Sequence, residues 1–466
     1  MKLRKHWCLL YVAVALVAVV MRLAPLLRSD LSFSYRPDDS YEYLQLAVRM
    51  RDGCGFARMI DRACQPAEIL RTPGYPLFLM MLPHVRWVLA AQALCGGLLC
   101  LLVAGWIAGP WNYSAALAAE CLIAFDVPSI VMSSEVMSET LFQLLLVLAL
   151  VPPLLTIEWP GKAGGIAVVA GVVAGCAILV RPIGVLLPII LPIPLILNPR
   201  LNIRARTINA IAAFALPAVF LVGWSGRNYE IAHYPGLSTV GAINMYYYRA
   251  ADVMARRQGI LLINERQAFG AKLGVRYDDI YRAGVQSEAL AQRMNRLGLE
   301  ILAHHPIQTA AMTAQAAVYL ALAPIRSPLA RMLGTSGESM GGGLNAGAPS
   351  LRRVRTVMRT ILTSPLLTAL VILEVMLTLI LCGGIAIAIG RCWCASLEYR
   401  LWTLYPAFAG IAVLCLAAGG EADARFRAPV IPLAIGAALG YFPNRQASTA
   451  DNESRMPSSA QAASGG

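Results

Sequence analysis

Charged residues are scarce in this chain of 466 residues. Asp, Glu, Lys and Arg together make up 14% of it, whereas hydrophobic residues make up 58%. Average soluble domains are ~25% charged and ~45–50% apolar. Since the apolar residues are also gathered in long blocks, the chain is not an ordinary soluble domain. The composition predicts an all-α, polytopic membrane protein.

Two further absences exclude other kinds of site and partner. None of the eleven cysteines belongs to a Cys-x-x-Cys pair, so a zinc site is not expected. The chain also lacks a Lys/Arg-rich tail interleaved with aromatic residues, so nucleic acid is not an expected partner. Basic residues still outnumber acidic ones by 39 to 26, which gives a net charge of +13. On a membrane protein this excess indicates basic loops and anionic lipid or phosphate partners.

The apolar blocks are long enough to cross a bilayer, for which a helix needs ~20 mostly apolar residues. We predict one membrane domain over residues 1–443, with long polar loops at 28–85 and 225–304. A disordered polar tail is expected over 444–466. The predicted spans cover residues 7–27, 86–108, 112–127, 139–157, 164–181, 183–198, 207–224, 306–325, 364–390, 401–419 and 427–443.

Basic residues predict which ends of these spans face the cytosol. Lys and Arg at 2–5 and at 200–206 put both stretches inside. The six predicted spans between them agree with this, and the two long loops then face the exterior. Cys54 and Cys64 lie in the first of these loops, where a disulfide can form; the sequence leaves that pairing open.

The topology of the C-terminal third has alternatives. Basic clusters at 352–359 and 391–400 are separated by a single predicted span, so they cannot both be inside. Either one cluster is external, or segment 306–325 lies in the interface and does not cross.

The first external loop opens with two adjacent acids, Asp38 and Asp39. An amphipathic helix follows, whose apolar positions recur at helical spacing from Tyr43 to Met50. Asp39 with Glu42 three residues later resembles a capping box, so one interpretation is an acidic helix cap. One helix needs only one cap, however, and the second carboxylate favours a catalytic function for the pair.

Other polar residues stand where apolar runs begin or end, and each has a structural alternative. Arg71 precedes the turn Pro73-Gly74. Its long side chain either reaches the membrane interface and keeps its charge in water, or binds a phosphate. Glu139 starts a span, where an acid suits the helix dipole but also marks a functional site. Arg181 is interpreted as a marker of a turn between two spans.

The same two interpretations hold for residues later in the chain. Arg227 and the tyrosines that start at Tyr246 either form an interfacial belt or line a sugar-phosphate pocket. The charged residues from Glu421 to Arg427 either anchor a helix or contact the donor.

These segments, in this order, resemble the GT-C class of membrane glycosyltransferases. The closest likeness is to the protein mannosyltransferase and aminoarabinose transferase superfamily, which uses polyprenyl-phosphate sugars. The likeness covers residues 7–442 and rests on "DDSYEYLQLA", "RTPGYPLFL", "SETLF", "VRPIGVLLP", "GRNY" and "ARFRAPVIP". The chain lacks the WWDYG-type sequence of oligosaccharyltransferases, so it is not expected to glycosylate asparagine sequons.

The resemblance implies about eleven to thirteen transmembrane helices and an active site on the exoplasmic face, at the inner (plasma) membrane. Carried over residue by residue, it makes Asp39 the base, with Asp38 next, and Glu139 a second catalytic acid. Arg71 would bind the lipid phosphate. In relatives the "RFRAP"-like segment is external, which places the 391–400 turn inside. The other predicted substrate-binding residues are Arg227, Tyr75, Tyr246 and Arg427.

The implied reaction transfers a sugar from a polyprenyl-phosphate donor to a hydroxyl of a glycan, lipid or protein, with inversion. Membrane lipids are the remaining expected partners. No cofactor is required by the sequence; a divalent cation between the acids is an open alternative that no His/acid spacing demands. The competing function is a transporter or flippase of lipid-linked sugars, for which internal repeats would be typical; no such repeat is visible.

Overall fold

The computed structural model describes residues 2–36, 39–57, 64, 67–108, 112–280, 288–335, 364–419 and 423–439. Asp38, the basic cluster at 352–359 and the predicted tail at 444–466 lie outside these ranges. Within them the chain forms helices and no strand; a single bridge joins Ala57 and Ala67.

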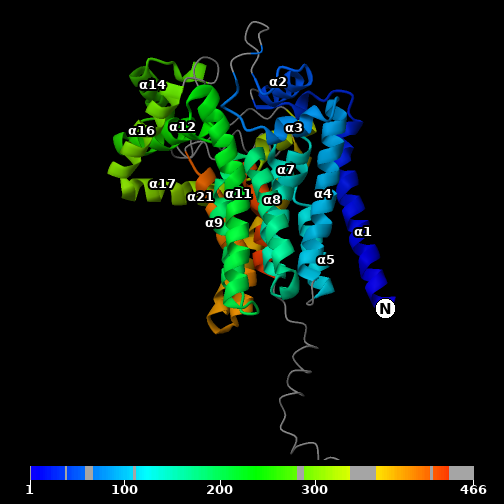
Figure 1. Ribbon diagram of the computed structural model, residues 1–466. Coiled ribbons are helices and arrows are strands. Elements are labelled where there is room, and N and C mark those ends of the chain that lie inside the picture. Colours follow the sequence, from blue (N-terminus) through cyan, green and yellow to red (C-terminus); the bar gives the residue numbers. More distant parts are fainter. Residues whose placement is uncertain are drawn as a thin grey trace, which may run out of the picture.

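Long apolar helices stand side by side in a bundle (Figure 1). Six of them have the length and composition of membrane spans, and the pair α5 and α6, bent by 52°, would make a seventh. Shorter apolar helices, among them α7, complete the bundle. These findings confirm the predicted all-α, polytopic membrane architecture. The helices are α1 (Lys2–Leu23), α4 (Val85–Ala108), α5 (Tyr113–Ala124), α6 (Val127–Ser133), α7 (Glu139–Leu155), α8 (Ala163–Val180), α9 (Leu187–Ile190), α10 (Ile193–Ile196), α11 (Ile203–Ala232), α20 (Pro365–Arg391), α21 (Leu397–Ala417) and α22 (Ile431–Leu439).

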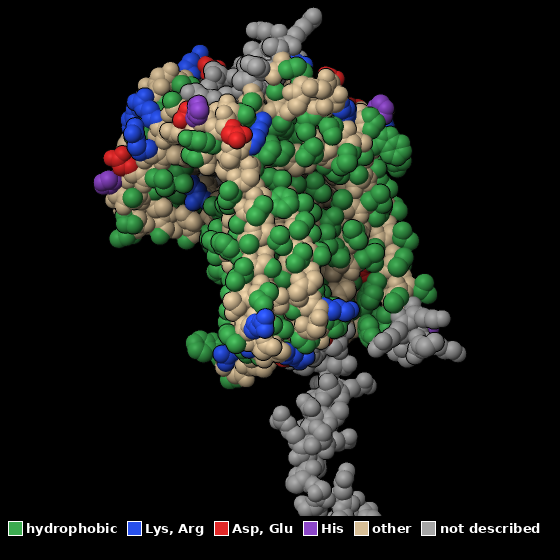
Figure 2. All heavy atoms as spheres, viewed as in Figure 1, with side chains coloured by type: hydrophobic (Ala, Val, Ile, Leu, Met, Phe, Trp, Pro, Cys, Tyr) green, Lys and Arg blue, Asp and Glu red, His purple; other side chains and the backbone are tan. Residues whose placement is uncertain are grey.

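The surface of the bundle matches this architecture. Figure 2 shows hydrophobic side chains over the middle of the helices, with Lys and Arg gathered toward the two ends. Apolar side chains that are exposed on α11, such as Ile211 and Val222, would face lipid. A bilayer therefore fits around the middle of the bundle.

The two basic stretches predicted to share a side do lie at one end of the bundle. The starts of α1 and α11 are at the same end (Figure 1), and Trp7 of α1 stacks on Tyr113 at the start of α5. Arg200 pairs with Glu398 at 2.9 Å, which brings the 391–400 turn to this end as well. The opposite end carries α2 (Asp39–Arg51), α3 (Gly74–Met80) and the segment η8 (Ala424–Val430).

One predicted span does not run along the bundle. Segment 306–325 forms α17 (Pro306–Leu322), which lies crosswise to the long helices (Figure 1). It has 17 residues, and polar side chains such as Gln308 and Gln315 interrupt its apolar sequence. A helix of this length and composition is short for a full crossing. The structure thus favours the alternative in which this segment stays at the interface.

A small layer of helices packs beside α17, separate from the main bundle. Its core contains the aromatic residues Tyr246, Tyr247 and Phe269. The layer is built from the second long polar loop, so that loop is folded rather than extended. Its helices are α12 (Val240–Ile243), the π-helical turn η5 (Asn244–Ala250), α13 (Ala251–Gln258), α14 (Leu262–Leu273) and α16 (Glu288–His304).

Gly74 allows the first loop to pack against the bundle. A Cβ atom at this position would lie 2.7 Å from the backbone of Leu179 and Val180, at the end of α8. Backbone atoms cannot rotate away, so Gly74→Ala is expected to cost about 1–3 kcal/mol through overpacking. The expected result is a lower thermal midpoint of the purified protein. Gly105→Ala is the matched control, because nothing lies within 4 Å of that site; an equal loss in both variants would contradict the packing argument.

Candidate active site

Asp39 lies between two arginines at the end of the bundle that carries α2. Arg71 Nη2 donates to Asp39 Oδ1 at 2.5 Å, and Arg425 Nη1 donates to Asp39 Oδ2 at 2.8 Å. The arginines come from the first loop and from η8, which are far apart in the sequence. Burial alone would raise the pKa of Asp39, but the charges of Arg71 and Arg425 outweigh it and hold that pKa well below its usual range.

Arg71 is fixed by three further contacts. Its Nε donates to Glu42 at 2.7 Å, and its guanidinium lies over the ring of Tyr43 at 5.1 Å. Its backbone N–H donates to Glu68 Oε1 at 2.9 Å. Glu42, which the sequence suggested as part of a capping box, therefore gives Arg71 its second carboxylate partner.

Glu139 is fully buried at the start of α7. Its carboxylate pairs with Arg181 at 2.7 Å and lies 3.8 Å from Arg425 Nε. Arg425 consequently stands between the two predicted catalytic acids, Asp39 and Glu139. Both Arg181 and Arg425 also lie against the face of Phe426.

Four more charged residues are linked to Arg425 by a chain of ion pairs. Arg331 pairs with Glu135 at 2.5 Å, and Glu135 lies 3.8 Å from Arg36. Arg36 in turn donates to Asp423, which lies 3.8 Å from Arg425. Burial raises the pKa of Glu135 more than the two arginines lower it. Burial also acts to raise the pKa of Asp423, but the arginines lower it overall.

Together these residues form one continuous network of alternating charge, which we call the arginine-carboxylate cluster. Among the described residues it holds five arginines and five acids, whose formal charges cancel. The members are Arg36, Arg71, Arg181, Arg331, Arg425, Asp39, Glu42, Glu135, Glu139 and Asp423. In the part of the chain that is described, no three His, Cys, Asp or Glu side chains gather as a metal site would need; between Asp39 and Glu139 the positive charge is that of Arg425.

The other predicted substrate-binding residues lie outside this cluster and have partners of their own. Tyr75 is buried and donates to Gln92 at 2.8 Å. Tyr246 donates to the Phe269 carbonyl at 3.2 Å, inside the helical layer. Arg227 and Arg427 bind partners that are not members of the cluster. Asp38 lies outside the described residues.

Arg227 links α11 to the disulfide loop of the first external segment. Its guanidinium donates to the carbonyls of Glu68 at 2.6 Å and Phe56 at 3.1 Å. Cys54 and Cys64 are joined by a disulfide, which answers the question that the sequence left open. The loop that Arg227 holds leads directly to Arg71.

Arg427 is buried in an ion pair with Glu374 of α20 and also donates to the Ala321 carbonyl at 2.8 Å. Glu374 accepts from the Ile325 backbone N–H at 2.9 Å. These contacts tie η8 and the end of α17 to α20.

The disulfide is expected to stabilise the first external loop. Closing a loop of about ten residues removes chain entropy equivalent to about 2–3 kcal/mol from the unfolded state. We expect Cys54→Ser to lower the thermal midpoint, and dithiothreitol to lower that of the wild type but not that of the variant. A wild-type midpoint that does not respond to the reductant would contradict this expectation.

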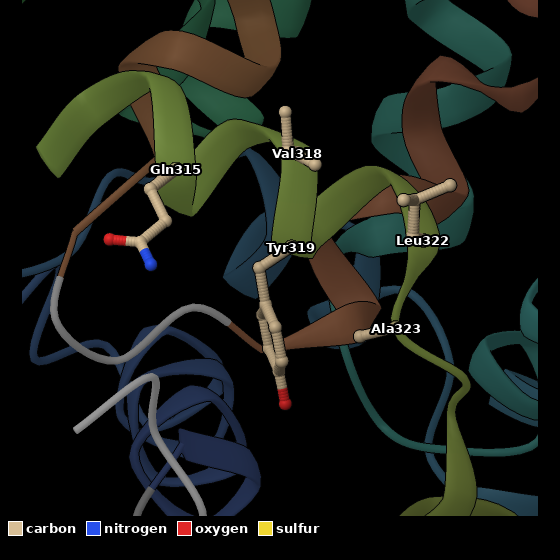
Figure 3. Close-up of a pocket in the computed structure, with 5 residues that line it drawn as sticks. All are labelled: Gln315, Val318, Tyr319, Leu322 and Ala323. Atoms are coloured by element: carbon tan, nitrogen blue, oxygen red, sulfur yellow. The ribbon is translucent and has the colours of Figure 1, made fainter. Parts of the chain in front are cut away.

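An apolar hollow of about 330 Å³ lies along α17. Figure 3 shows its five lining residues, with the ring of Tyr319 projecting from the helix. Tyr319 packs in the same apolar group as Phe426. Burial and then the negative charge of Asp423 raise the pKa of Tyr319, so its phenol is within electrostatic reach of the cluster. The lining residues are Gln315, Val318, Tyr319, Leu322 and Ala323.

The sequence selects only part of the arginine-carboxylate cluster as site residues. It selected Asp39, Glu139 and Arg71, which the structure brings together. Arg425 is among the charges that the sequence offers either as helix anchors or as donor contacts, but it is not among the selected site residues, although its place in "ARFRAP" is a signal. The sequence around Arg331 offers no comparable signal, because its contact with Glu135 depends on the tertiary fold.

The bundle has an all-α fold that is similar to that of two solved structures. It is similar to the structure of the archaeal oligosaccharyltransferase AglB from Archaeoglobus fulgidus in complex with an inhibitory peptide and a dolichol-phosphate. That match has a TM-score of 0.50 and 14% identity, and covers 100% of this chain and 53% of the other. The apo form of the Archaeoglobus fulgidus oligosaccharyltransferase matches at 0.50 and 14%, over 93% of this chain and 50% of the other.

The chain thus spans about half the length of these solved structures. No family model matches it, and no curated protein matches it in sequence. The comparison confirms the predicted fold of a multi-pass membrane protein.

Proposed function

We propose that this protein is an integral-membrane glycosyltransferase that moves a sugar from a polyprenyl-phosphate donor to a hydroxyl acceptor. The observation that carries the proposal is Asp39, held by Arg71 and Arg425 at one end of a GT-C-type bundle. A similar fold has been solved with a dolichol-phosphate, which supports a lipid-phosphate donor. The apolar hollow along α17 offers a place for part of the lipid chain.

The proposed reaction needs one base and several cations. Asp39 takes the proton of the acceptor hydroxyl, and the acceptor oxygen forms a bond to the anomeric carbon. The bond from that carbon to the phosphate oxygen breaks, and polyprenyl phosphate leaves with the electron pair. A single displacement of this kind inverts the anomeric centre. Arg71 and Arg425 stabilise the charge on the departing phosphate.

The remaining predicted residues receive roles according to their partners. Glu139 holds Arg425, the neighbour of Asp39, in place from the buried side. Arg227 supports the loop that carries Arg71, and Arg427 fixes η8 next to Arg425. Tyr75 and Tyr246 are buried and shape the scaffold.

The cluster is proposed to face the exterior or periplasm, with the protein in the plasma (inner) membrane. The basic residues at the opposite end, around Arg200 and Arg391, support this orientation by the positive-inside rule.

A transfer assay tests the function. Purified protein is incubated with a panel of radiolabelled polyprenyl-phosphate sugars and with membranes from a strain that lacks the protein. We expect one donor to pass its label to a membrane acceptor. If every donor stays intact, or if labelled lipid crosses the bilayer of a vesicle without being cleaved, the protein is not the proposed transferase; the second result would indicate a flippase.

A further inference from the structure

Among the described residues, each arginine of the arginine-carboxylate cluster already pairs with a carboxylate, and this constrains how an anionic donor can bind. Arg71 and Arg425 each place a nitrogen on a different oxygen of Asp39, at 2.5 and 2.8 Å. The ten formal charges of the cluster already cancel. A phosphate that entered without displacing a carboxylate would add negative charge to a neutral, largely buried network, which is unfavourable.

We propose that the phosphate of a polyprenyl-phosphate ligand replaces Asp39 on Arg71 and Arg425, and that this exchange frees Asp39 to act as the base. The inference rests on the proposed function for the identity of the ligand. A phosphate presents oxygens that can pair with guanidinium groups as a carboxylate does. The phosphate would therefore accept hydrogen bonds from the same two guanidinium groups, those of Arg71 and Arg425, that now bind the carboxylate of Asp39.

Of the two predicted catalytic acids, Asp39 is the better placed to leave the arginines. Its side chain is 21% exposed, whereas that of Glu139 is 0% exposed. Asp39 is also the first residue that the structure describes in α2. The arginines do not lose all their partners when it moves, because Arg71 keeps Glu42 at 2.7 Å and Arg425 keeps Glu139 at 3.8 Å. Those two acids hold the guanidinium groups in place for the incoming phosphate.

The exchange also resolves a chemical difficulty. While both arginines hold Asp39, its pKa is far below its usual range, and such a carboxylate is a poor acceptor of a hydroxyl proton. Removal of the two contacts, with a negative phosphate nearby, shifts that pKa upward. Asp39 then becomes a useful base only when the donor is bound, so base strength and donor binding are coupled.

Binding of polyprenyl monophosphate, which carries no sugar, tests the exchange without turnover. The protein is placed in phosphatidylcholine nanodiscs, and the dissociation constant for undecaprenyl phosphate is measured. Asp39→Asn keeps the shape but removes the competing charge, so we expect it to bind about tenfold tighter than the wild type. Arg425→Gln is expected to bind at least about tenfold more weakly. Glu398→Gln, at the other end of the bundle, is the matched control and should not change the constant.

Weaker binding by Asp39→Asn would overturn the proposal, because it would mean that the carboxylate helps to hold the ligand. Equal binding would overturn it too, because it would mean that Asp39 does not compete with the phosphate. Unchanged binding by Arg425→Gln would overturn it too. If Asp39→Asn does not fold, Asp39→Ser must show the same tightening. Inorganic phosphate in place of the lipid is expected to give the same rank order at lower affinity; the reverse order would count against the exchange. The proposed function fails differently, since it is lost if no sugar is transferred, whatever the binding constants.

Discussion

Asp39→Asn is expected to lower the rate of sugar transfer by about 10²–10⁴-fold, the usual contribution of a general base. The amide keeps the size of the side chain and still caps or starts a helix well. It cannot accept the hydroxyl proton. The variant should therefore insert, fold and bind lipid phosphate, yet transfer little sugar. Initial rates with purified protein at saturating donor give the comparison.

The control for this prediction is Glu398→Gln, which also replaces a carboxylate by an amide. Glu398 pairs with Arg200 at the opposite end of the bundle, so the variant should transfer sugar at the wild-type rate. A rate for Asp39→Asn within about threefold of the wild type would remove Asp39 from the role of base.

Arg427→Gln is expected to cost about 3–5 kcal/mol of stability, because it leaves Glu374 as an uncompensated buried acid. Both side chains are at most 7% exposed. Replacing both residues, in Arg427→Gln with Glu374→Gln, should recover much of that loss. Thermal midpoints of the two single variants and the double variant complete a double-mutant cycle.

The exposed pair Arg200 and Glu398 provides the control for this cycle. An ion pair of this kind contributes only about 0–1 kcal/mol, so neither single variant should shift the midpoint by much. The stabilising function of the buried pair would be contradicted if the Arg427 and Glu374 variants shift the thermal midpoint as little as the Arg200 and Glu398 variants do. It would also be contradicted if the shifts of the two single variants add up to that of the double variant.

The sequence predicted the acids and the first arginine of the site because they stand where apolar runs begin or end. In a bundle of antiparallel spans, alternate run ends meet at one face, so the order of the runs is enough to place Asp39, Arg71 and Glu139 together. The same alternation of span ends places the basic residues at the other end of the bundle.

What the sequence could not provide is the direction in which a boundary arginine points. Arg227, Arg425 and Arg427 look alike as charges beside spans, but one supports a loop, one pairs with Asp39, and one is buried against Glu374. The sequence left the course of α17 open between a span and an interfacial helix, because its 17 residues are mostly apolar but are interrupted by polar side chains.

The most direct test of the central claim is the consumption of a polyprenyl-phosphate sugar by the purified protein, followed by mass spectrometry of the lipid. With the cognate sugar and an acceptor, the wild type and Glu398→Gln should release free polyprenyl phosphate, while Asp39→Asn should leave the donor intact. Release of the lipid phosphate by Asp39→Asn at the wild-type rate would contradict the claim that this cluster carries out glycosyl transfer.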